Sequence, residues 1–206
     1  MKRKFITFIM AIVALCAVNE ADAQFRWGVT AGVDFNNMKF KQDLFTVDQA
    51  FGESAGIHAE MMFPGIGFGL DMGLRYEQRG ATLHMGEKLL WESQGYGKER
   101  LYVHYIDLPF HLKFKYTRLQ GLEDYIAPFV YGGPTFAIQA GHSKCDAIDF
   151  SGGEIALTAG AGFELYKRWQ IAASYTWGMT YALKTVQLKD FSARNRTWDI
   201  RVTYFF

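Results

Sequence analysis

The most constraining feature of this sequence is a strict two-residue alternation at its carboxyl end. From Arg196 to Phe206 the chain reads RTWDIRVTYFF, and every second residue from Trp198 onward is large and apolar. The positions between them include Asp199 and Arg201. Because a helix has a period of 3.6 residues, this pattern predicts a β-strand with one apolar and one polar face. In water it would belong to a half-buried sheet, and in a bilayer to a barrel wall with its apolar side toward lipid.

The same alternation recurs in seven earlier stretches, which brings the predicted number of strands to eight. Two stretches are irregular. In the fourth, Val103 and Tyr105 are apolar out of phase, which together with Pro109 predicts a β-bulge; the fifth is apolar on both faces, so its register is undefined. The predicted strands are Arg26–Asn36, Ser54–Phe63, Ile66–Glu77, Tyr102–Tyr116, Tyr125–Ala140, Glu154–Tyr166, Trp169–Tyr181 and Arg196–Phe206.

The connections between these stretches alternate between long and short. Turns at Pro64-Gly65 and Lys167-Arg168 and a moderate connection at 117–124 separate four long ones. An up-and-down barrel has this rhythm, because its turns on one side of the membrane stay tight while its loops on the other side grow. We therefore predict an all-β fold, an eight-stranded antiparallel up-and-down transmembrane β-barrel, closed so that no strand edge faces lipid. The long connections are Asn37–Glu53, Gln78–Leu101, Gly141–Gly153 and Ala182–Asn195.

The amino terminus has the composition of a secretory signal peptide. Basic residues at positions 2–4 precede an apolar stretch that ends at Val18, and Ala21-Asp22-Ala23 matches a small-x-small cleavage site. The apolar stretch is shorter than the roughly 20 residues that a transmembrane helix needs. We expect residues 1–23 to be a cleaved signal peptide and residues 24–206 to form one barrel domain.

Composition agrees with a barrel and argues against a nucleic-acid partner. Hydrophobic residues make up 50% of the chain, yet the mean hydropathy is −0.06, as expected when each strand is half apolar and half polar. Cleavage would remove three basic and two acidic residues and leave 19 of each sign. A chain of balanced charge lacks the basic surface that binds a phosphate backbone.

The last strand also resembles a known targeting signal. Trp198, Val202, Tyr204 and the terminal Phe206 are similar to the carboxyl-terminal assembly signal of Gram-negative outer-membrane β-barrels. The resemblance implies recognition by the barrel-assembly machinery during insertion. Together with the export signal, it predicts that the protein resides in the outer membrane of a Gram-negative cell.

Four motifs, in order along most of the chain, resemble the PorT-like outer-membrane β-barrel family, of the OmpX- and OmpA-like eight-stranded type. This resemblance implies the same fold and location. The namesake of the family serves type IX secretion, a role that membership alone does not transfer. The motifs are YIDLPF at 105–110 followed by Leu112-Lys113, PFVYGGP at 128–134, AGAGFE at 159–164, and Ala173-Ser174-Tyr175 followed by Gly178.

Charged residues recur on the predicted inner face of the strands. An eight-stranded barrel is just wide enough for side chains to fill it, so a general diffusion pore is not expected. Because charges are almost never buried unpaired, we interpret the inward charges as a salt-bridged interior; the alternative is a proton or ion path or an acid–base pair. No spacing marks a catalytic carboxylate. The predicted interior network is Glu60, Asp71, Arg75, Glu77, Asp107, His111, Lys113, Lys115, Glu164, Asp199 and Arg201.

The last long connection and the start of the terminal strand are rich in cations. Lys184, Lys189, Arg194 and Arg196 stand against a single acidic residue, Asp190. Cations at this level would face the phosphates of outer-leaflet lipopolysaccharide and bind them electrostatically. We therefore predict contact with outer-membrane lipid and lipopolysaccharide through these four residues.

The third long connection carries residues with metal-ligand chemistry. His142, Cys145, Asp146 and Asp149 lie close together in the sequence. A metal site needs three or four ligands that converge at about 2.0–2.3 Å, which a loop with one histidine and one cysteine seldom supplies. We predict solvated loop residues here, with neither a metal nor a cofactor.

Small outer-membrane enzymes that modify lipid A use serine and histidine near the outer rim. Ser143 beside His142, or Ser93 with His84, could be proposed as such a pair, but no nucleophile signature surrounds either. We therefore predict a non-enzymatic membrane anchor that displays external loops for adhesion, lipid or protein contact. The first alternative is an accessory component of a secretion (type IX-like) or transport complex of the envelope. The second is an outer-membrane lipid A-modifying enzyme.

Overall fold

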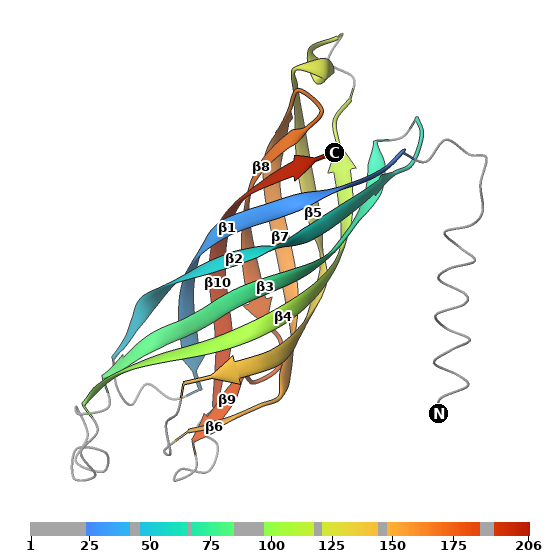
Figure 1. Ribbon diagram of the computed structural model, residues 1–206. Coiled ribbons are helices and arrows are strands. Elements are labelled where there is room, and N and C mark those ends of the chain that lie inside the picture. The colour runs from blue at the N-terminus through green and yellow to red at the C-terminus, as the bar shows by residue number, and fades with distance from the viewer. Residues whose placement is uncertain are drawn as a thin grey trace, which may run out of the picture.

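In the computed structural model, eight long antiparallel strands form a closed barrel (Figure 1). Each long strand pairs with the next one along the chain, and β1 pairs with β10 to close the wall. The predicted eight-stranded antiparallel fold is confirmed. The wall strands are β1 (Gln24–Phe40), β2 (Val47–Met62), β3 (Phe68–His84), β4 (Lys98–Lys115), β5 (Ile126–His142), β7 (Gly153–Leu165), β8 (Trp169–Gly178) and β10 (Ser192–Phe205).

The structure describes residues 24–41, 46–65, 67–84, 97–117, 121–143, 148–185 and 192–206. The predicted signal peptide, residues 1–23, lies outside this part of the chain. In the described ranges, no helix has both the length and the apolar character that a membrane span requires.

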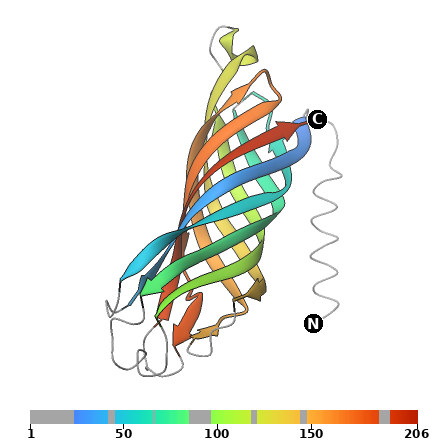
Figure 2. The same cartoon turned by 60° about the vertical axis from the view of Figure 1, so that its left-hand side comes forward.

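Three short elements accompany the wall. The 3-10 helix η2 (Leu122–Asp124) lies between β4 and β5, and the strands β6 (Ile148–Phe150) and β9 (Leu183–Thr185) form a small ladder. β9 also pairs with β10. Both short strands lie at the end of the barrel remote from the carboxyl terminus, as Figures 1 and 2 show. We call this end the loop end, and the other the turn end.

Tight turns close the turn end. Between β2 and β3, Gly65 and Gly67 adopt φ values of 80° and 72°, a region that glycine enters without steric cost. We predicted a third strand starting at Ile66, but β3 starts at Phe68 because Gly67 still belongs to the turn. Between β7 and β8, Tyr166 and Lys167 both have positive φ, as a tight hairpin of this hand requires.

Over the middle of the barrel, the two faces of each strand alternate as predicted. On β10, Trp198 and Ile200 are 55% and 49% exposed, whereas Asp199 and Arg201 are buried. A water-soluble protein has the opposite arrangement, with apolar side chains inside and charges outside. An apolar outer surface around a polar interior is the arrangement of a barrel in hydrocarbon.

Toward the loop end, the two faces exchange character. On β4, Val103 and Tyr105 are buried inside the barrel, while His104 points outward. The exchange occurs at one level of the wall, because the last outward apolar residues, Phe35 of β1 and Trp198 of β10, are register partners. The first outward polar residues beyond this level are Asn37 on β1, Gln49 on β2, Gln78 on β3, His104 on β4 and Arg196 on β10.

This exchange explains why the predicted strands are too short at the loop end. Beyond the level of Phe35 and Trp198, the outer surface is polar and the interior is apolar. A prediction that requires apolar residues on the outer face therefore ends each strand at this level. The predicted loops Asn37–Glu53 and Gln78–Leu101 are therefore wrong in extent: β1 continues to Phe40, β2 starts at Val47, β3 continues to His84 and β4 starts at Lys98.

The predicted bulge in the fourth strand is only partly correct. The β4–β5 ladder does shift between His104 and Tyr105, but the extra residue is Ala140 on β5. Val103 and Tyr105 keep the inward phase of β4, and the register is the same on both sides of Pro109 in both ladders. Val103 and Tyr105 are apolar because the barrel interior becomes apolar at this level, and the inward and outward phase of β4 does not change.

Candidate functional site

The interior at the turn end holds a compact cluster of charges around Glu60. Lys113 Nζ lies 2.6 Å from Glu60 Oε2, and Lys115 Nζ lies 2.8 Å from Glu60 Oε1. Lys115 also reaches Glu164 Oε2 at 2.7 Å, and Arg26 pairs with both glutamates. Each of these charges has a partner of opposite sign, which offsets the cost of removing it from water.

Asp71 extends this cluster toward the middle of the barrel. Its Oδ2 lies 3.1 Å from Lys113 Nζ and 3.5 Å from His58 Nε2. With Asp71 included, three cations face three carboxylates. Gln170 completes the cluster, because its amide donates to Glu60 and to Glu164 at 2.8 Å each.

A second cluster is centred on Arg79, nearer the loop end. The guanidinium of Arg79 lies 2.8 Å from Glu77 Oε1, 2.5 Å from Asp107 Oδ2 and 3.4 Å from Glu154 Oε2. Arg75 adds a contact of 2.9 Å to Glu77 Oε2. Arg79 is completely buried, so this cluster depends on one desolvated side chain that bridges β3, β4 and β7.

Hydroxyl groups join four strands between the two charged clusters. His111 Nε2 lies 3.0 Å from Thr135 Oγ1, Thr135 lies 3.0 Å from Thr158, and Thr158 lies 3.0 Å from Thr176. This row follows β4, β5, β7 and β8 around the inner wall. It gives His111 a neutral partner rather than an ion pair.

The middle of the barrel also holds a separate polar group on β10. Ser174 donates to Asp199, whose other oxygen lies 3.6 Å from Arg201 Nε. Arg201 in turn donates to the hydroxyl of Tyr131. Asp34 is the register partner of Asp199 and accepts from Ser54 at 3.4 Å.

At the loop end an apolar cluster fills the interior beyond the charges. It combines inward residues of β1, β3, β4, β5 and β10 with one residue from each of the two short strands, Leu183 of β9 and Phe150 of β6. Its members are Met38, Phe40, Ala81, Leu83, Leu101, Val103, Tyr105, Ala137, Leu183 and Ala193, with Val47 and Phe150 packed against them.

The structure places all eleven residues of the predicted network inside the barrel, none more than 7% exposed. They do not form a single network: two ionic clusters are separated by the hydroxyl row and the Asp199 group. Sequence reasoning missed Arg26, Arg79 and Glu154, which belong to the two clusters. Each of the three lies two residues, or a multiple of two, from a residue of the same strand that was predicted to face inward. Extending the alternation from Glu77 by two residues, for example, would have found Arg79.

The predicted assembly-signal residues lie on the outer face of β10 next to β1. Trp198, Val202 and Phe206 are exposed on the wall. The terminal Phe206 donates its backbone N–H to the carbonyl of Trp27 at 3.0 Å, and the two rings lie 4.5 Å apart. The last residue therefore takes part in barrel closure.

The predicted lipid-contact cations are only partly within the described residues. Lys189 lies outside them, and Lys184 lies in β9. Arg194 and Arg196 lie on the outer face of β10, where Arg194 is the register partner of Lys39 on β1. Lys39 is a cation that sequence reasoning missed, because it lies in the first long connection and only the β1–β10 ladder brings it beside Arg194.

Arg194 is held in place by an aromatic neighbour in the connection after β8. Its guanidinium carbon lies 4.7 Å from the ring centroid of Tyr181. A hydrogen bond from Arg194 lowers the pKa of the Tyr181 phenol from its ordinary value. Both residues line a pocket of about 310 Å³ together with Lys39, Lys41 and Arg196.

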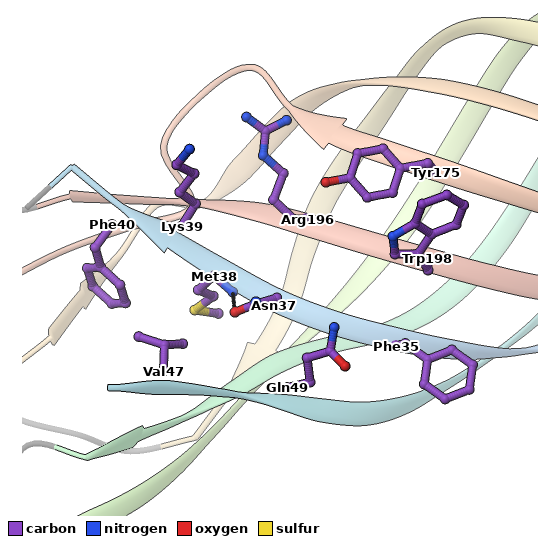
Figure 3. Close-up of a pocket in the computed structure, with 10 residues that line it drawn as sticks. All are labelled: Phe35, Asn37, Met38, Lys39, Phe40, Val47, Gln49, Tyr175, Arg196 and Trp198. Atoms are coloured by element: carbon purple, nitrogen blue, oxygen red, sulfur yellow. Dashed lines mark hydrogen bonds between the residues drawn. The ribbon is translucent and has the colours of Figure 1, made fainter. Parts of the chain in front are cut away.

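A larger pocket of about 520 Å³ opens where β1 and β2 diverge (Figure 3). The β1–β2 ladder ends at the pair Asn36 and Ala50. Beyond it, the backbone N–H of Met38 donates to the side-chain Oδ1 of Asn37 at 2.8 Å instead of to a strand. The pocket is lined by Phe35, Asn37, Met38, Lys39, Phe40, Val47, Gln49, Tyr175, Arg196 and Trp198.

The alternative sites considered in the third long connection are largely outside the described residues. Cys145 and Asp146 lie outside them, as does Ser93. Across the described ranges, no group of three or more His, Cys, Asp or Glu side chains could hold a metal ion. His142 Nδ1 lies 2.9 Å from the carbonyl oxygen of Ser143 and its ring stacks on Phe150, while the hydroxyl of Ser143 accepts the backbone N–H of Tyr102 at 3.0 Å.

Comparisons with known proteins agree with this geometry. The sequence profile described as outer membrane protein beta-barrel domain matches residues 8–206. No curated protein sequence matches the chain.

Several solved structures are similar in fold. A major outer membrane protein of Thermus thermophilus superposes with a TM-score of 0.51 and 15% identity, covering 89% of this chain and 100% of that one. The attachment invasion locus protein Ail of Yersinia pestis superposes with a TM-score of 0.46 and 13% identity, covering 89% of this chain and 99% of that one. The outer membrane enzyme PagL superposes with a TM-score of 0.45 and 11% identity, covering 84% of this chain and 98% of that one.

Proposed function

This chain belongs to the outer membrane protein β-barrel domain family, and from that premise we propose that it is a non-enzymatic outer-membrane anchor. In this proposal, its external surface makes the functional contacts, with lipid or with other proteins, and its lumen does not conduct solutes. The outer membrane is its location. The long connections at the loop end would face the cell exterior, and the turn end would face the periplasm.

The observation that carries the proposal is the filled interior. From the turn end to the loop end, the lumen holds the Glu60 cluster, the hydroxyl row with the Asp199 group, the Arg79 cluster and the apolar cluster. An eight-stranded barrel has little internal width to spare, and side chains of this size use it. What remains available to partners is the outer surface and the loop end.

Conductance measurements test the closed lumen directly. The purified barrel, inserted into a planar lipid bilayer, should give no discrete current steps, whereas a porin inserted in the same way should give them. Reproducible single-channel steps from the folded wild-type protein would refute the anchor proposal and favour a transport role.

A crosslinked pull-down from outer membranes tests the external surface. The PorT-like motifs support one specific form of the proposal, an accessory of a type IX-like secretion or transport complex. Co-purification with secretion components would favour this form, and recovery with lipid alone would favour a free-standing anchor.

The alternative of a lipid A-modifying enzyme makes a different prediction. The hydroxyl of Ser143 accepts the backbone N–H of Tyr102 at 3.0 Å, and His142 Nδ1 lies 2.9 Å from the carbonyl oxygen of Ser143. These contacts do not pair the two side chains as nucleophile and base, which supports a non-enzymatic role. Deletion of the gene should therefore leave the mass of lipid A unchanged. Loss or gain of an acyl chain on deletion would support the enzyme instead.

A further inference from the structure

We propose that the outer wall at the β1–β10 seam binds the phosphorylated head group of an outer-leaflet glycolipid. The inference rests on the proposed function, because it requires the loop end to face the cell exterior, and it names one partner of that surface. We call the binding surface the seam site. It consists of Asn37, Lys39, Gln49, Tyr175, Arg194 and Arg196, which line the two adjoining pockets.

The charge of the seam site selects an anion. Lys39 and Arg194 face each other across the β1–β10 ladder, and Arg196 is the register partner of Asn37. None of the described residues that line either pocket is acidic. Among the ion pairs that join described residues, none includes Lys39 or Arg196. A ligand with negative charge would therefore supply a counter-ion that no described residue supplies to Lys39 or Arg196.

The donors of the seam site suit a phosphate group. In Figure 3, the side chains of Lys39 and Arg196 rise to the same side of neighbouring strands, and the hydroxyl of Tyr175 is turned toward Arg196. Because Asn37 Oδ1 already accepts the N–H of Met38, the amide nitrogen of Asn37 remains as a donor. A planar guanidinium beside an ammonium and neutral donors matches the several acceptor oxygens of a phosphate.

The level of the seam site indicates that the phosphate belongs to a lipid. The site lies directly beyond the last outward apolar residues, Phe35 and Trp198, where the wall changes from apolar to polar. The rings of Tyr175 and Trp198 lie 4.7 Å apart, and those of Phe35 and Phe51 lie 5.7 Å apart. Aromatic side chains of this kind mark the boundary between hydrocarbon and head groups.

The arrangement of the two pockets points to a head group with more than one phosphate. The pockets share Lys39 and Arg196, and the smaller one adds Arg194. Together they form a cationic surface longer than one phosphate needs. A glycolipid that carries two phosphates, with its acyl chains along Phe35 and Trp198, would occupy both.

A lipid titration of the full barrel tests the proposal. The folded protein in detergent is titrated with bisphosphorylated lipid A, and the bound lipid is counted by native mass spectrometry. The double variant K39A/R196A should bind about 30-fold more weakly, the factor expected for two cations near a membrane surface. The matched control is K98A/R100A, which removes two cations from the loop end of β4 and should bind like the wild type.

Two further ligands separate the sources of the phosphate. Lipid A stripped of its phosphates should bind the wild type as weakly as intact lipid A binds K39A/R196A, and inorganic phosphate should not displace intact lipid A. Equal binding by the wild type and K39A/R196A would overturn the proposal, as would an equal loss in the control. Displacement by inorganic phosphate would identify a free-anion pocket instead.

Folding and the proposed function are checked separately. Each variant must keep the gel mobility of the folded barrel. If the double variant does not fold, R196A alone, which changes one half-buried position on the outer face, takes its place. A conducting lumen would refute the anchor proposal without changing lipid binding. Failure of lipid binding would leave the conductance result untouched.

Discussion

At the scale of single residues, the interior is determined by how each buried charge is paired. Arg79 illustrates this, since it is fully buried and contacts Glu77, Asp107 and Glu154. A planar guanidinium can serve three carboxylates at once, which the single ammonium of a lysine cannot do with the same geometry. Removing it would leave Arg75 as the only described cation in this cluster, and it would leave the buried Glu154 without a cationic partner among the described residues.

Arg79→Met should therefore be strongly destabilising. We expect a loss of about 3–5 kcal/mol, because removal of one partner leaves buried charges uncompensated. Reversible urea unfolding in lipid vesicles, followed by tryptophan fluorescence, measures it. Lys98→Met is the control, since Lys98 is 63% exposed beside Asp48 and should change stability by about 1 kcal/mol or less. A loss for Arg79→Met no larger than that of the control would contradict this account.

At the scale of elements, the inward-facing glycines of β7 leave space for aromatic side chains of the neighbouring strand β5. A Cβ at Gly160 would lie 2.5 Å from the ring of Tyr131, and one at Gly162 would lie 2.8 Å from the ring of Phe129. The two glycines on β7 thus make room for two rings of β5. The Gly-x-Gly motif that suggested the family has this packing role here.

Gly160→Val should displace the Tyr131 ring and destabilise the barrel. Overpacking of this kind typically costs about 1–3 kcal/mol, and the contact of Tyr131 with Arg201 should be lost with it. The neighbouring Ala159→Val adds apolar volume on the lipid-facing side and should stay within about 0.5 kcal/mol of the wild type. The same urea measurement compares them, and equal stability of the two variants would exclude the packing role.

The end of β10 is the second element with a specific consequence. Phe206 pairs with Trp27 through its backbone and its ring, and it also belongs to the predicted assembly signal. Phe206→Ala should slow insertion that depends on the barrel-assembly machinery and leave spontaneous refolding in detergent nearly unchanged. Phe25→Ala, which removes a ring of similar exposure at the turn end of β1, should slow neither. If both variants slow assembly equally, the effect is that of an aromatic rim and not of a signal.

At the scale of the whole molecule, the barrel has two surroundings along its axis. Apolar side chains face outward over the middle, and polar side chains face outward beyond the level of Phe35 and Trp198. The interior follows the opposite order, with charges in the membrane portion and an apolar cluster at the loop end. The proposed closed lumen and the proposed seam site both rest on this arrangement.

The folded protein should therefore require a membrane or detergent. On cell fractionation, we expect the heat-modifiable folded form in the outer-membrane fraction, because the exposed apolar belt would aggregate in water. Recovery of a folded form from the aqueous periplasmic extract without detergent would contradict the assignment of the belt to lipid.

The sequence by itself determined the number of wall strands, their antiparallel order and the inward position of most of the charged residues. It could do so because, within the lipid level, side-chain polarity alternates strictly with the two faces of a strand. The tight turn at Lys167 followed from the same periodicity. Asp199 and Arg201 could be assigned to the interior for this reason alone.

Only the tertiary structure decided where each strand ends and which charges pair. Beyond the membrane level, the polarity rule reverses, so the strand around Lys39 and Met38 looked like a loop. Pairing depends on residues brought together from distant strands, as with Arg79 and Glu154. The seam site likewise exists only because closure of the barrel places the first wall strand beside the last, a contact between chain ends that no local pattern records.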